Sequence, residues 1–147
     1  MTPELDESSV RTNRRWLALA GYAALAVAVG FILYTQRPTG INGLPAEITV
    51  SQAASMREKG SFLLDVRQPE EWNESHIPGS TLIPLGELRA RMGEVPRERY
   101  IVVVCRSGNR SRRARELLID AGFKWVTSVA GGITAWSADG RPTVSGP

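Results

Sequence analysis

The sequence predicts an α/β domain with a five-stranded parallel sheet flanked by helices, preceded by one transmembrane helix. From residue 47 onward, short apolar segments alternate with segments that have helical features, the pattern of strands connected by helices. One apolar segment, "YIVVVC" at 100–105, is continuous, which is typical of a strand buried on both faces of a parallel sheet. Upstream, residues 16–34 form an uncharged run that indicates a membrane span.

The N-terminal part of the chain has two sections. Residues 1–15 are polar without an apolar period, so we expect a disordered tail. Residues 16–34 as a helix would span about 28 Å, close to the hydrocarbon thickness of a bilayer, with Trp16 and Tyr34 in the headgroup layers. A core helix would keep a polar stripe, and a cleaved signal peptide would have a shorter apolar region, so the run favours a retained anchor.

Arginines flank the predicted anchor unequally. Arg11, Arg14 and Arg15 precede it, and only Arg37 follows closely. The side of a span that is richer in Lys and Arg stays cytoplasmic. We therefore expect a cytoplasmic N-terminus, with the following domain on the outer side of the membrane, periplasmic or extracellular.

The expected boundaries of the domain follow from composition. Residues 35–46 contain two Pro and two Gly and are expected to form a linker. The domain itself is expected at 47–140, followed by a C-terminal tail at 141–147. Strands are expected at 47–50, 61–66, 80–85, 100–105 and 125–129. Helices are expected between them, at 51–60, 68–75, 86–93, 111–123 and 133–139.

Local signals support several of these boundaries. Ser51 is a good N-cap for the first helix of the domain, and Gly60 is a good residue to end it. Pro69 lies near the start of the second helix and is followed by acidic residues, which suit the helix dipole. Pro84 restricts the third strand to a sheet edge or a strand end.

Composition excludes several classes of function. The net charge of +3 is too small to indicate nucleic-acid binding by itself. The chain has one Cys and one His, so it has no internal disulfide and too few ligands for a structural zinc site. We therefore expect no nucleic-acid partner, no metal and no cofactor, and the single thiol becomes the candidate for chemistry.

Cys105 stands at the carboxyl end of the most apolar predicted strand, where open α/β sheets bind their ligands. The residues that follow, "RSGNRS", include Gly108, which permits a tight turn whose backbone N–H groups form an anion nest. Arg106 and Arg110 add positive charge, and the expected helix start near Ser111 adds its dipole. Each feature lowers the pKa of a thiol, so the sequence predicts a reactive, anion-facing thiolate rather than an inert packing cysteine.

Four segments resemble motifs of the rhodanese sulfurtransferase family. "CRSGNR" at 105–110 resembles its six-residue active loop, and "LLDVRQPEEW" at 63–72 resembles its Asp-x-Arg segment. "HIPGS" at 76–80 resembles its His-Ile-Pro-Gly-Ala/Ser segment, and "AGGITAW" at 130–136 resembles its closing Gly-Gly-x-x-x-Trp element. The resemblance extends over residues 46–138. Ser75 departs from it, since the family usually has Gly before the His, and we expect a turn there with a small backbone adjustment.

The resemblance implies a rhodanese-like fold and a thiosulfate sulfurtransferase activity. Cys105 would take sulfur from thiosulfate or a persulfide donor, carry it as a persulfide, and pass it to a thiol or cyanide. The substrate-binding residues would be those of the loop, namely Arg106, Ser107, Gly108, Asn109, Arg110 and Ser111. Asp65 and Arg67 would brace the loop through an ion pair, and His76 would serve as a structural hydrogen-bonding residue. Packing is the expected role of three tryptophans, Trp72, Trp125 and Trp136.

Two alternatives stay open at this point. A cysteine phosphatase has Cys, five further residues and then Arg, whereas Arg110 is one position too early and Val104 stands where phosphatases usually have His. The shorter loop favours a single sulfur atom over a phosphate. The second alternative is a membrane-tethered module that binds or senses persulfide without turnover. Repeated turnover with thiosulfate would distinguish an enzyme from such a module.

Overall fold

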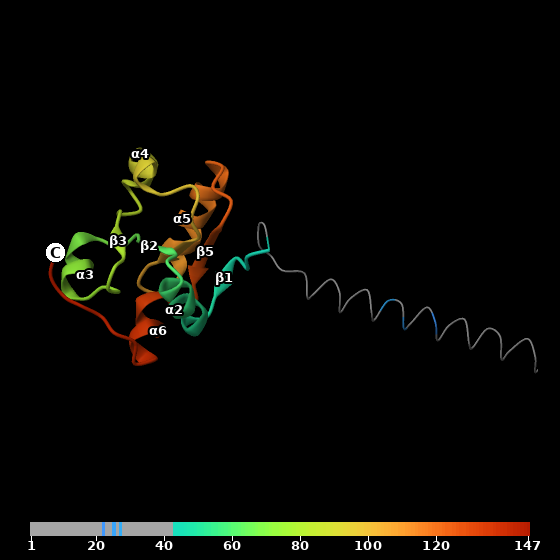
Figure 1. Cartoon of the computed structure of the whole chain (residues 1–147), viewed down its shortest axis with the longest axis horizontal. Coiled ribbons are helices and arrows are strands. Elements are labelled where there is room, and N and C mark those ends of the chain that lie inside the picture. Colours follow the sequence, from blue (N-terminus) through green and yellow to red (C-terminus); the bar gives the residue numbers. More distant parts are fainter. Residues whose placement is uncertain (1–21, 23–24, 26, 28–42) are drawn as a thin grey trace, which may run out of the picture. The chain divides into compact units, whose positions relative to one another are not determined.

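The computed structural model describes residues 43–147 continuously and, upstream of them, only Tyr22, Leu25 and Val27 (Figure 1). The predicted tail, the remainder of the predicted transmembrane helix and most of the predicted linker lie outside the described residues. Among the residues that are described, no helix has the length and apolar character needed to cross a membrane.

Five parallel strands form one sheet in the order β1-β5-β4-β2-β3, which confirms the predicted architecture. Their bounds are Glu47–Ile48 (β1), Phe62–Asp65 (β2), Thr81–Leu82 (β3), Ile101–Val104 (β4) and Val126–Val129 (β5). β4 is central and wholly buried, as its continuous apolar run indicated. β3 lies at an edge, as Pro84 just beyond it indicated.

Helices connect the strands and cover both faces of the sheet. Their bounds are Val50–Glu58 (α2), Pro69–Glu74 (α3), Leu88–Arg91 (α4), Asn109–Asp120 (α5) and Gly132–Ala138 (α6), with a 3-10 helix at Met92–Glu94 (η1). Buried residues of α4 and α5 pack on one face with Val103, and buried residues of α2 and α6 pack on the other with Val102. Because neighbouring residues of β4 enter different cores, the strand is apolar throughout.

Each of these α-helices begins one or two residues from its predicted start, and for two of them the capping residues explain the difference. The N-cap of α2 is Thr49 and not Ser51, because the Thr49 hydroxyl accepts from the Gln52 N–H and the Gln52 side chain accepts from the Thr49 N–H. This capping box also ends β1 earlier than predicted. α5 begins at Asn109, earlier than predicted, because Gly108 takes a left-handed φ of 103° and serves as its N-cap.

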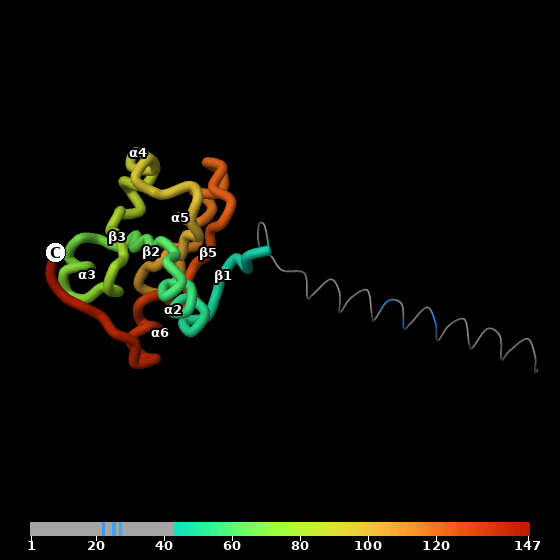
Figure 2. Tube along the Cα trace, viewed as in Figure 1, coloured from blue at the N-terminus to red at the C-terminus, as the bar shows by residue number. Residues whose placement is uncertain are grey.

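The C-terminal tail, residues 141–147, runs from α6 to α3 (Figure 2). Val144 and His76, which follows α3, exchange two backbone hydrogen bonds of 2.7 and 2.9 Å. Nearer to α6, the Trp136 indole N–H donates to the carbonyl oxygen of Pro142 at 3.0 Å. The tail therefore joins two helices that are distant in the sequence.

Candidate active site

Cys105 directly follows β4 and is 1% exposed. The chain then turns through Gly108, whose backbone N–H donates to the Cys105 sulfur at 3.1 Å. The Ser111 hydroxyl lies 3.5 Å from the same sulfur and donates to the Gly108 carbonyl at 2.9 Å. A six-residue loop and the first turn of α5 thus surround the thiol with hydrogen-bonding groups, as the sequence predicted.

The pKa of the Cys105 thiol reflects two opposing effects. Burial is the largest and raises the pKa, since a thiolate loses solvation there. The hydrogen bond between Cys105 and the Ser111 hydroxyl lowers it, as do bonds from the backbone N–H groups of Ser111, Gly108 and Ser107, and together they prevail. The net pKa is below the ordinary value, in agreement with the expectation from the sequence. A lowered thiol pKa increases the fraction of nucleophilic thiolate at a given pH.

The start of α6 is in direct contact with this loop. The Ile133 N–H donates to the Cys105 carbonyl at 2.8 Å, and Thr134 donates to the Arg106 carbonyl from both its N–H (3.2 Å) and its hydroxyl (2.9 Å). Gly132 makes the approach possible, because a Cβ at that position would collide with the Cys105 carbonyl oxygen. The second glycine of the "AGGITAW" segment is therefore explained by close contact with the active loop.

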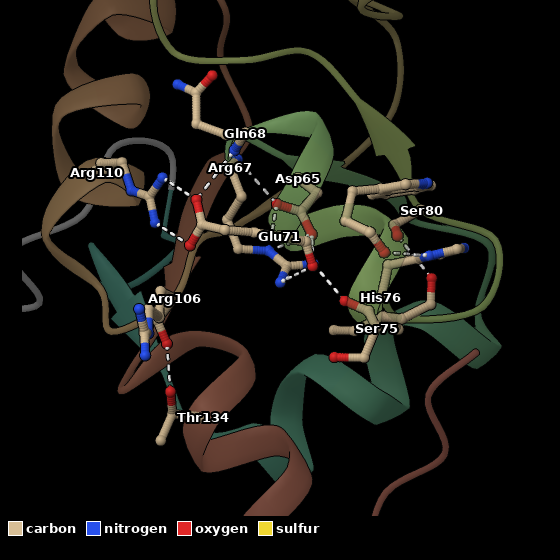
Figure 3. A network of polar contacts seen from close by, with 12 residues as sticks. Asp65, Arg67, Gln68, Glu71, Ser75, His76, Ser80, Arg106, Arg110 and Thr134 are labelled. Atoms are coloured by element: carbon tan, nitrogen blue, oxygen red, sulfur yellow. Dashed lines mark hydrogen bonds and ion pairs between the residues drawn. The ribbon is translucent and has the colours of Figure 1, made fainter. Parts of the chain in front are cut away.

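Glu71 of α3 holds the other side of the loop. Arg110 donates to both carboxylate oxygens of Glu71, at 2.6 and 2.7 Å (Figure 3). This hydrogen-bonded contact lowers the pKa of Glu71 to about 2, despite partial burial that raises it, and Gln68 and Arg67 reinforce the effect. The pKa of Arg110 is raised in turn, chiefly by the bond to Glu71. The pair is ionised at any physiological pH.

Asp65 and Arg67 form the predicted ion pair, with 2.7 Å between Arg67 Nη2 and Asp65 Oδ2 and both side chains buried. Arg67 also donates to the carbonyl oxygens of Glu71 (3.0 Å), within α3, and of Ser75 (2.8 Å), just beyond it. The pair thus braces α3, the helix that carries Glu71. Its support of the Cys105 loop is indirect, through the bond between Glu71 and Arg110.

The remaining predicted loop residues face outward. Arg106, Ser107 and Asn109 are exposed, and Asn109 accepts a bond of 2.6 Å from Arg112 on α5. No hydrogen bond or ion pair joins the Arg106 guanidinium to any residue in the part of the chain that the structure describes. Within that same part, no group of three His, Cys, Asp or Glu side chains is placed to hold a metal ion.

His76 and the tryptophans have the structural roles that were expected. The His76 ring stacks on Trp72 with 3.7 Å between ring centroids, and its Nδ1 lies 3.1 Å from the Trp72 carbonyl oxygen. Trp136 is buried in the core, and Trp125 is half-buried and packs beside Tyr100. The expectation of a turn at Ser75 was wrong, since its backbone is extended (φ −169°, ψ 141°), which any residue can adopt.

Sequence reasoning missed two residues whose side chains hydrogen-bond to the loop, Glu71 and Thr134. Both lie inside segments that resemble family motifs, 63–72 and 130–136. Glu71 was interpreted only as an acidic residue in a first helical turn. The available signal for Glu71 was an acidic residue close to the Asp-x-Arg segment. The sequence did not show its partner, because Arg110 lies 39 positions further along the chain.

The chain is similar to known proteins over this domain. The family model described as Rhodanese-like domain matches residues 49–139. A sulfurtransferase from Allochromatium vinosum is 39% identical over 84 residues, which cover 57% of this chain and 78% of that protein. The thiosulfate sulfurtransferase GlpE from Pseudomonas syringae pv. syringae is 37% identical over 89 residues, which cover 60% of this chain and 84% of that protein.

Solved structures agree with the sequence comparison. The crystal structure of a rhodanese-related protein from Thermoplasma volcanium matches with a TM-score of 0.63 at 35% identity, covering 67% of this chain and 96% of that one. The matched family model includes the whole loop from Cys105 to Ser111 as well as Glu71 and Gly132. The chain therefore belongs to the family of rhodanese-like domains, and the named relatives above include sulfurtransferases.

Proposed function

We propose that this protein is a sulfurtransferase that moves sulfane sulfur from thiosulfate or a persulfide donor, through a persulfide on Cys105, to a thiol or cyanide acceptor. The observation that carries the proposal is the Gly108 N–H, 3.1 Å from the Cys105 sulfur in a loop of six residues. Backbone donors at that distance stabilise a negative sulfur without a separate base. The named activities of the relatives from Allochromatium and Pseudomonas support the same chemistry.

The proposed reaction has two displacement steps. The Cys105 thiolate attacks the outer sulfur of thiosulfate, a new S–S bond forms, the S–S bond of thiosulfate breaks, and sulfite leaves with the electron pair. The acceptor, cyanide or a thiolate, then attacks the outer sulfur of the persulfide. The Cys105 thiolate leaves, and thiocyanate or a new persulfide is released. No net oxidant or reductant is needed in either step.

Mass spectrometry of the intact protein after exposure to thiosulfate tests the first step. We expect a mass gain of one sulfur that maps to Cys105 and is removed by cyanide with release of thiocyanate. Cys105→Ser should abolish both results. Uptake of one sulfur without repeated turnover would instead indicate a persulfide-sensing module. Faster hydrolysis of phosphate esters than sulfur transfer by the same preparation would indicate a phosphatase.

We also propose that residues 16–34 anchor the protein in a membrane, with the N-terminus cytoplasmic and the domain on the outer side. The uncharged run and the excess of arginines before it support this arrangement. A membrane-impermeant amine label on intact cells, followed by proteolysis and mass spectrometry, tests the sidedness. Labelling of Lys59 and Lys124 only after the cells are opened would contradict an outer domain.

A further inference from the structure

The two arginines of the loop differ in what they contact. Arg110 is held by Glu71 through two bonds, and the two side chains are 31% and 24% exposed. Arg106 is exposed, and its guanidinium has no hydrogen-bond or ion-pair partner among the described residues. Figure 3 shows Arg110 turned toward Glu71, with Arg106 lying apart from that pair beside Thr134. The sequence alone treats the two arginines as equivalent.

Glu71 is itself fixed in place. One of its carboxylate oxygens accepts from the Gln68 N–H at 3.1 Å, which completes the N-terminal capping of α3. Its carbonyl oxygen accepts from Arg67, which is held in turn by buried Asp65. The carboxylate therefore has little freedom to leave Arg110, and the pKa of about 2 keeps it charged.

An anionic substrate that bound the two Arg110 Nη groups in place of Glu71 would have to break this pair. It would replace two charge-assisted hydrogen bonds and would place its own negative charge beside a half-buried carboxylate. The Glu71 carboxylate also offsets part of the Arg110 charge, which interacts with the Cys105 sulfur. Arg106 incurs neither cost, because its guanidinium is exposed and unpaired in the described structure.

We propose, on the basis of the sulfur transfer proposed above, that Glu71 withholds Arg110 from the substrate and leaves Arg106 as the guanidinium that selects anionic sulfur donors. Glu71 is then a positioning residue that acts through Arg110, and Arg106 is the residue that determines donor specificity. The substrate class is a small anion such as thiosulfate, held at the mouth of the loop.

Steady-state kinetics of the full chain with thiosulfate and cyanide test this assignment. Arg106→Gln should raise the KM for thiosulfate about tenfold, the value of one lost charge-assisted contact. Glu71→Gln should lower that KM about threefold, with kcat changed less than about twofold, because it frees a cation. In the double variant, freed Arg110 should bring the KM back toward that of the wild type.

The matched control is Arg113→Gln, which removes the same charge from an exposed position on α5 and should leave the KM unchanged. A higher KM in Glu71→Gln, or a double variant no better than Arg106→Gln, would overturn the proposal. If Glu71→Gln does not fold, as judged by circular dichroism, Glu71→Asp takes its place. Its shorter side chain keeps the charge but breaks the two-bond geometry, and a smaller decrease in KM is expected.

A second measurement does not depend on sulfur transfer. Iodoacetate and iodoacetamide both alkylate the Cys105 thiolate, but only iodoacetate is an anion, so the ratio of their rate constants reports anion attraction alone. We expect this ratio to fall in Arg106→Gln, rise in Glu71→Gln and stay constant in Arg113→Gln. A wild type that transfers no sulfur would refute the proposed function, while the alkylation ratio would still decide the roles of Glu71 and Arg106.

Discussion

The backbone N–H of Ile133 donates a hydrogen bond of 2.8 Å to the carbonyl oxygen of Cys105, the residue that carries the only thiol. The first turn of α6 thus rests directly on the backbone of the active loop. This contact depends on Gly132, whose φ of 57° and lack of a Cβ allow the two segments to meet.

Gly132→Ala should therefore destabilise the fold and displace the loop. We expect a loss of about 2–4 kcal/mol in the free energy of unfolding, from the collision with Cys105 and the left-handed backbone together. Gly140→Ala is the control, since Gly140 has a similar φ of 68° with open space around it, and should cost about 1–2 kcal/mol. Chemical denaturation measures both variants, and equal losses would contradict the role of the collision.

Ser111→Ala should raise the pKa of the Cys105 thiol, because the hydroxyl stabilises the thiolate. The pH profile of alkylation by iodoacetamide should shift to higher pH, so alkylation at neutral pH should be slower. The lost bond to the Gly108 carbonyl should also cost about 1–2 kcal/mol of stability. Ser107→Ala, at an exposed position, is the control and should keep the wild-type profile. An unchanged profile in Ser111→Ala would refute the stabilising role of its hydroxyl.

Glu71 should make stability depend on pH in the acid range. Its pKa is about 2 in the folded protein against an ordinary 4.5, so the folded state favours its ionised form. The stabilisation, about 1–3 kcal/mol, is complete above the ordinary pKa and is lost as the pH falls through the folded value. Urea denaturation of the wild type and Glu71→Gln should therefore differ at neutral pH and converge toward pH 2. Glu70→Gln, at the exposed neighbouring position, should show no such convergence.

Arg67→Met should be strongly destabilising, because it leaves the Asp65 carboxylate buried without its partner. Loss of one member of a buried pair costs about 3–5 kcal/mol. Arg91→Met removes an arginine from an exposed ion-pair group on α4 and should leave the unfolding midpoint nearly unchanged. Thermal unfolding compares the two variants, and similar midpoints would show that burial does not amplify the loss at Arg67.

Val144→Pro should loosen the C-terminal tail from the segment after α3. Proline lacks the N–H that Val144 donates to the His76 carbonyl at 2.9 Å, so we expect a loss of about 1–2 kcal/mol. Val144→Ala keeps that N–H and changes a side chain that is 44% exposed, so it should resemble the wild type. Hydrogen exchange at His76 and Val144 reports the bridge directly. Equal protection in both variants would argue against it.

Much of the site could be predicted because it is contiguous in the sequence. Cys105, the turn at Gly108 and the start of α5 follow one another along the chain, so their strand-loop-helix geometry depends on local conformation. The buried central strand could also be predicted, since a continuous apolar run of this kind is typical of a strand covered on both faces. The N-cap of α2 could not be predicted in the same way, because Thr49 and Ser51 are both good caps. The capping box that Thr49 forms with Gln52 decided between them.

The sequence by itself determined the alternation of strands and helices and the position of the thiol at a strand end. These depend on apolar periodicity and on turn residues, which act over a few positions. Only the tertiary structure decided that Arg110 pairs with Glu71 while Arg106 stays unpaired among the described residues, and that α6 supports the loop through Gly132. Such contacts join segments far apart in the chain, and the packing of α3 and α6 beside the loop creates them.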